Sequence, residues 1–124
     1  MLNHILLYIG SALPLLWGIA HLFPTSSVVK GFGDISLENK RIIMMEWIIE
    51  GVALIFMGAL VVTVTLIDAQ SAVSKAVYGL TAIGLLAFAC VSIFTGFRVH
   101  FLPYKLCPFI FAGSAILIII GGVL

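Results

Sequence analysis

The chain has 124 residues, of which 63 % are hydrophobic and only 9 % are charged, and its mean hydropathy is +1.30. Soluble domains contain about 45–50 % apolar and about 25 % charged residues, so this composition excludes both a soluble globular enzyme and a disordered chain. A net charge of +1 supplies no basic surface for nucleic acid, and two cysteines are too few for a disulfide scaffold. The composition predicts one integral membrane domain over residues 1–124.

Four apolar segments are each long enough to cross a bilayer, which requires about 20 apolar residues in a helix. We predict helices over about 3–23, 37–67, 74–97 and 105–124, which together form an all-α four-helix transmembrane bundle. The first segment is expected to be retained rather than cleaved as a signal peptide, because no basic residue precedes it. Unbroken apolar runs such as residues 115–120 lack the alternation of a transmembrane β-barrel strand.

The three connections differ in length and polarity. Residues 24–41 form the longest polar stretch, residues 68–75 a short turn and residues 98–105 a compact link. In the longest stretch, Asp34 or Ser36 is a suitable N-cap for the second transmembrane helix. That helix is therefore expected to begin before the membrane does.

Basic residues give the expected orientation. Five of the six Lys and Arg residues lie in the connections 24–41 and 98–105, which must be on the same side because two helices separate them. The positive-inside rule places both connections in the cytoplasm and both termini outside, in the cytoplasmic or plasma membrane. Trp17, Trp47 and Tyr104 fall near the same interface, where aromatic residues are enriched.

The ionisable residues near the hydrocarbon are the candidates for function. Counting about 1.5 Å of rise per residue across a core of about 30 Å gathers them into one layer at the cytoplasmic end. The candidates for ligand binding or acid–base chemistry in this layer are His21, Glu46, Glu50, Arg98 and His100, with Lys105 and Cys107 at the same level. Charges in hydrocarbon are costly, so these side chains are expected to face the bundle, to pair or to line water.

Several interpretations of this layer stay open. Glu46 and Glu50 are four residues apart and share a helix face. Neutralising pairs, Glu50 with Arg98 and Glu46 with His100, would make the layer purely structural. His21, His100, Glu46 and Glu50 also form a conceivable but weak metal-ligand set. A haem held by His21 and His100 is less favoured because both lie at helix ends, and no cofactor is assigned.

A family resemblance concerns residues 18–24, Gly-Ile-Ala-His-Leu-Phe-Pro. This segment resembles the exit of the first helix in DoxX-like small membrane proteins, where a Gly-x-x-(Lys or His)-Leu pattern is followed by a nearby Pro. The length and the four-helix layout are similar as well. The resemblance implies that His21 occupies the matching polar position. It also implies a role among membrane oxidoreductase subunits or assembly chaperones for other membrane proteins.

Three classes of function are compatible with these observations. The favoured one is a binding or accessory subunit that holds a lipid, a quinone or a partner helix, alone, as a homodimer or with another membrane protein. The second is a membrane-embedded enzyme on an apolar substrate, with Glu50 or Glu46 and His21 or His100 as acid and base. The third is a small proton-coupled transporter in which Glu50 is the coupling acid.

Overall fold

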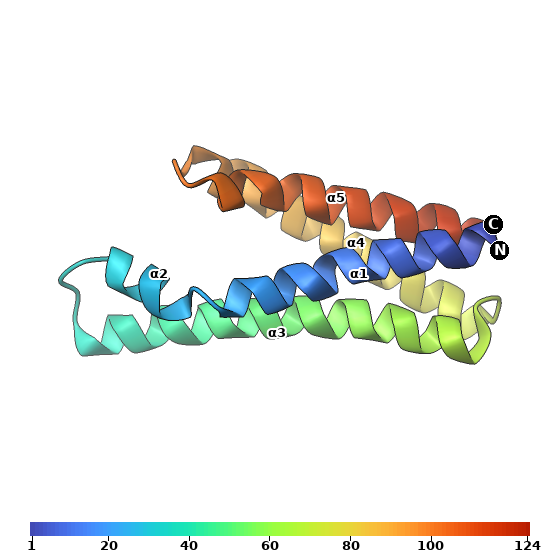
Figure 1. Cartoon of the computed structure of the whole chain (residues 1–124), viewed down its shortest axis with the longest axis horizontal. Helices are drawn as coiled ribbons and strands as arrows, with labels where there is room; N and C mark the ends of the chain where they lie inside the picture. Colours follow the sequence, from blue (N-terminus) through green and yellow to red (C-terminus); the bar gives the residue numbers. More distant parts are fainter.

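The computed structural model describes all 124 residues and contains helices without any strand (Figure 1). The elements in chain order are α1 (Leu2–Leu22), α2 (Thr25–Gly31), α3 (Leu37–Asp68), α4 (Ala72–Phe94), the short 3-10 helix η1 (Gly96–Arg98) and α5 (Leu102–Val123). The helices α1, α3, α4 and α5 are long and apolar enough to cross a membrane. The prediction of an all-α four-helix transmembrane bundle is therefore confirmed, and the chain is a multi-pass membrane protein.

Hydroxyl caps explain where two of these helices begin. Ser36, and not Asp34, caps α3, because its Oγ accepts a hydrogen bond from the Asn39 N–H at 3.1 Å. Ser71 caps α4 in the same way, by accepting from the Ser74 N–H at 3.0 Å. Gly33, with φ of +70°, supplies the left-handed turn that leads into α3.

Two connections differ from the sequence prediction. Residues 24–41 contain the helix α2, whose Val29 is buried and whose Thr25 hydroxyl donates to the Leu22 carbonyl at 2.6 Å. The prediction missed α2 because one buried side chain in seven residues gives no recognisable periodicity. The link before α5 is shifted: α4 ends at Phe94 and α5 already begins at Leu102, with Pro103 in its first turn. Proline is tolerated there because the first-turn N–H has no intrahelical partner.

Small residues bring α1 and α3 into close contact. Ser11 and Gly18 are seven residues apart on α1, and Gly51 and Gly58 are seven apart on α3. A Cβ on Gly18 would lie only 2.6 Å from the Gly51 carbonyl oxygen, and one on Gly58 would lie 2.7 Å from the Leu15 Cβ. The two backbones approach because these positions carry little or no side chain, as is common in membrane bundles.

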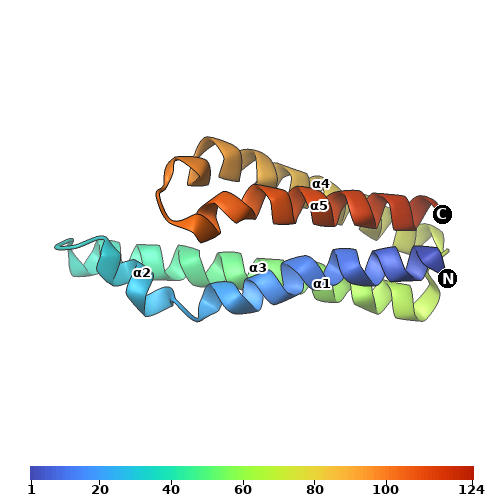
Figure 2. The same cartoon turned by 45° about the horizontal axis from the view of Figure 1, so that its top comes forward.

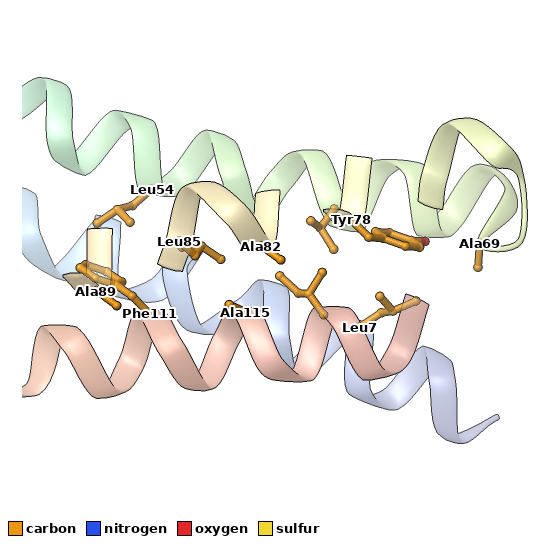
Figure 3. Packing of buried hydrophobic residues seen from close by; sticks show 11 residues of the cluster. Leu7, Leu54, Ala69, Tyr78, Ala82, Leu85, Ala89, Phe111 and Ala115 are labelled. Carbon is orange, nitrogen blue, oxygen red and sulfur yellow. The ribbon is translucent and has the colours of Figure 1, made fainter. Parts of the chain in front are cut away.

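A second close contact joins α1 to α5 near the chain termini. The Ser114 hydroxyl donates to the Gly10 carbonyl, and a Cβ on Gly121 would lie 2.9 Å from the Asn3 carbonyl oxygen. The two termini consequently lie at the same end of the bundle (Figure 1). The hydrophobic core follows the bundle axis as a cluster of 11 buried residues, among them Leu7, Leu54 and Phe111 (Figure 3).

The opposite end of the bundle is more open. At the end that carries the termini, by contrast, α3 and α4 are joined: the Thr65 and Tyr78 hydroxyls share a hydrogen bond of 2.9 Å, and the Ser74 hydroxyl donates to the Asp68 carbonyl at 2.6 Å. These bonds lie close to the turn between the two helices. Towards the end that carries α2 and η1, the α4–α5 pair separates from the α1–α3 pair (Figures 1 and 2).

Candidate functional site

A cavity of about 570 Å³ lies at the end where the two helix pairs separate. Its size falls within the roughly 300–1,000 Å³ that is typical of small-molecule sites. All four transmembrane helices contribute to its wall, together with α2 and the loops beside α5. The wall is rich in aromatic rings, those of Trp17, Trp47, Phe88, Phe101, Tyr104 and Phe111.

His21 and Trp47 form one wall of the cavity. Their rings are stacked, with centroids 3.8 Å apart and planes 16° from parallel. The Trp47 indole Nε1 donates a hydrogen bond of 2.8 Å to the His21 carbonyl oxygen, which fixes the indole on α1. This pairing follows from the contact of Gly18 with Gly51, because His21 comes three residues after Gly18 and Trp47 four residues before Gly51. The close approach of α1 and α3 thus determines which rings face each other.

The polar centre of the cavity is the pair of His21 and Glu50. The His21 Nε2 lies 3.5 Å from the Glu50 Oε2, and 8 % of the histidine side chain but 44 % of the glutamate side chain is exposed. The Nε2 atom is buried and has no hydrogen-bond partner. A buried polar atom without a hydrogen bond costs about 1–3 kcal/mol, so a ligand group that reaches this atom would gain a hydrogen bond. The half-exposed carboxylate beside it supplies an acceptor.

One turn of α5 completes the wall opposite α1. Tyr104 places its ring edge towards Trp47, with centroids 6.1 Å apart and planes at 70°. Cys107, which is a free thiol, lies one turn later, and its Sγ donates to the Pro103 carbonyl at 3.5 Å. The surface of the cavity is largely apolar. Four ionisable side chains also line it: His21, Glu50, Tyr104 and Cys107.

The structure brings together only part of the predicted layer. His21 and Glu50 meet in the cavity, whereas Glu46 is exposed and lines a smaller hollow beside it. Arg98 in η1 and His100 after it are exposed and do not line the cavity. The reason is that α4 ends at Phe94, so both residues lie in the turns beyond the helix rather than on it.

The predicted ion pairs and the predicted metal-ligand set both required Arg98 or His100, and the structure contradicts both. The pairs Glu50 with Arg98 and Glu46 with His100 are not formed, and the single ion pair within 4.0 Å joins His21 to Glu50. The proposed metal-ligand set is not assembled either, because the chain has no group of three or more His, Cys, Asp or Glu residues placed to hold a metal ion. Of the predicted layer, His21, Glu50 and Cys107 line the cavity, whereas Glu46, Arg98, His100 and Lys105 do not.

The inward role of the aromatic residues is not apparent from the sequence alone. The sequence predicts Trp17, Trp47 and Tyr104 as interface anchors at this end of the bundle, but all three line the cavity. A signal was present in the spacing: Trp17 precedes His21 by four residues, and Trp47 precedes Glu50 by three. Residues at these spacings share a helix face. Because His21 and Glu50 face the bundle interior, Trp17 and Trp47 face it as well.

No family model, no curated protein and no solved structure matches the chain. The resemblance to DoxX-like proteins therefore stays an expectation from residues 18–24, and the site is interpreted from its own geometry.

Proposed function

We propose that this membrane protein binds an apolar small molecule, a lipid or a quinone, whose uncharged head group carries hydroxyl or carbonyl oxygens. The observation that supports the proposal is the buried Nε2 atom of His21 in an aromatic cavity, which makes no hydrogen bond and lies 3.5 Å from the Glu50 carboxylate. A protonated Nε2 would donate to a carbonyl oxygen, and an unprotonated one would accept from a hydroxyl. The Glu50 carboxylate beside it would accept from a second hydroxyl.

The lining also favours an uncharged head group over a phosphate. Phosphate groups are bound by Arg and Lys through charge-assisted hydrogen bonds. The cavity lining contains neither residue type, and its one carboxylate would repel an anion. The stacked rings of His21 and Trp47 instead offer a flat apolar wall, which suits a planar ring or a narrow chain.

The proposal includes a place in the cell. Five of the six Lys and Arg residues lie at the cavity end of the bundle, in or next to the connections there. In the cytoplasmic or plasma membrane, the positive-inside rule would put the cavity at the cytoplasmic face and both termini outside. A ligand would then bind in the inner leaflet.

A role as an accessory or assembly subunit fits this site best. Binding alone requires no more than the cavity and its two polar groups, and the resemblance to DoxX-like proteins supports such a role. The partner in the proposal is a second copy of the chain or another membrane protein. A membrane enzyme with Glu50 as acid or base is the second candidate, and the 3.5 Å distance from Glu50 to His21 favours it over the transporter.

The test of the proposal uses the fluorescence of the protein itself. The chain has two tryptophans, and both line the cavity. Quinones quench indole fluorescence, so titration with decylubiquinone is expected to give saturable quenching, and monopalmitoylglycerol is expected to shift the emission if the ligand is a lipid. His21→Phe retains an aromatic ring on Trp47 but removes the free nitrogen, and is expected to weaken binding about tenfold, equivalent to one lost hydrogen bond.

The control variant is His4→Phe, which changes a histidine that does not line the cavity and is expected to bind like the wild type. Binding of both probes to His21→Phe with unchanged affinity, or no saturable response from the wild type to either probe, would contradict the proposal.

A further inference from the structure

A second hollow of about 390 Å³ lies beside the cavity and follows one side of α3. We call it the α3 groove. It shares Trp47, Glu50 and Phe88 with the cavity, so the two hollows lie side by side with these three residues between them. The residues that line only the groove all belong to α3: Ile42, Ile43, Glu46, Ile49 and Ala53.

The groove lies where α3 and α4 are not held together. Near their connecting turn, the two helices are joined by the bond between Thr65 and Tyr78, and Gly84 makes room for Met57, whose Cε would lie 2.7 Å from a Cβ at that position. One turn beyond Gly84, Phe88 is the single α4 residue in the groove. Its ring packs edge-on against Phe111, with centroids 6.0 Å apart. One side chain thus stands between the groove and the cavity on this side.

The groove has a polar and an apolar part. Glu46 lines the groove alone, and Glu50, one helical turn further, lines both hollows. Two carboxylates one turn apart, about 6 Å along the axis, give successive acceptors for a polar head group moving towards His21. Ile49 and Ala53 lie beside them and match a hydrocarbon tail.

We propose that the α3 groove is a lateral portal for a single-tailed amphiphile. The head group passes Glu46, Glu50 and Phe88 into the cavity, and the tail remains in the groove over Ile49 and Ala53. This inference rests on the proposed binding function, and it adds the ligand class and the route. One tail is specified because every residue of the groove except Phe88 lies on the single helix α3.

The experiment fills the groove without touching the head-group site. Ala53→Phe adds a ring to the groove, and Val52→Phe adds the same ring at the neighbouring, exposed position outside it. Neither variant changes the number of tryptophans, so fluorescence titration remains valid. Each protein is titrated with decylubiquinone and with its tail-free parent quinone; monopalmitoylglycerol and monobutyrylglycerol give the same comparison for a lipid head group.

If the groove is a portal, filling it should lower the affinity for a long-tailed probe but not for a short one. Ala53→Phe should weaken binding of the long-tailed probe about tenfold, a typical cost of overfilling a packed site, and leave the short probe unaffected. Val52→Phe should bind both probes like the wild type. If Ala53→Phe does not fold, Ile49→Phe at a more exposed position of the groove provides the same test.

Two results would overturn the portal while leaving the proposed function intact: unchanged binding of the long probe to Ala53→Phe, or equal weakening of long and short probes. If the wild type binds neither quinone nor monoacylglycerol of either length, the proposed function fails and the portal fails with it.

Discussion

At the level of single residues, the proposed binding site depends on His21 and on the side chains that hold it in place. The depth of His21 and Glu50 along their helices was sufficient to predict that they share a layer. It was not sufficient to exclude Arg98 and His100, because their position depends on where α4 ends. The helix α4 ends at Phe94 with Thr95 as its C-cap, so Arg98 lies beyond the helix. Such a local ending cannot be recognised from hydropathy.

The indole of Trp47 is expected to stabilise the site through its donor as well as its ring. Trp47→Phe keeps a ring on His21 but loses the hydrogen bond to the His21 carbonyl, and should lower the free energy of unfolding by about 1 kcal/mol. Trp47→Leu loses the stacked ring too and should lower it further. Thermal denaturation in mild detergent measures both. Equal stability of Trp47→Phe and the wild type would show that the hydrogen bond contributes nothing.

At the element scale, the contact between α1 and α3 positions the site. The glycines and Ser11 were visible in the sequence, but their partners were not, because a spacing of seven residues on one helix does not identify the helix that packs against it. The helix α2 was missed for a related reason: it is seven residues long, and its structure depends on packing that a single segment does not reveal.

Adding one methyl group to this contact should separate the helices. In Gly18→Ala, the new Cβ would lie 2.6 Å from a backbone oxygen of α3, which cannot move aside as a side chain can. We expect a loss of about 1–3 kcal/mol of stability, with weaker ligand binding because His21 and Trp47 are pulled apart. The matched control is Gly79→Ala on α4, where a Cβ meets no atom within 4 Å and which should be neutral or slightly stabilising. Similar melting temperatures for both variants would contradict the packing argument.

At the scale of the whole molecule, the four apolar segments of the sequence predicted four membrane-spanning helices, and the structure has four helices long and apolar enough to cross a membrane. The separation of the helix pairs could not be predicted, since it results from contacts that are dense near the termini and sparse near α2. The cavity is a consequence of this asymmetry. The aromatic residues that line the cavity are present in the sequence, but only the packing of the helices shows that they face one another.

The orientation is testable with single cysteines in a variant without Cys90 and Cys107. Ser27→Cys, in an exposed part of α2, should react with a membrane-impermeant maleimide only after the membrane is opened. Gln70→Cys, in the exposed turn between α3 and α4, should react in intact cells. The opposite labelling pattern would place the cavity at the outer face.

The proposed binding of an apolar ligand at His21 is best tested by native mass spectrometry of the protein purified in mild detergent, at increasing activation energy. We expect one discrete added mass per chain, of a lipid or a quinone, that dissociates at lower energy from His21→Phe than from His4→Phe. A bare chain, even after decylubiquinone or monopalmitoylglycerol is added, or a mass retained equally by both variants, would contradict it.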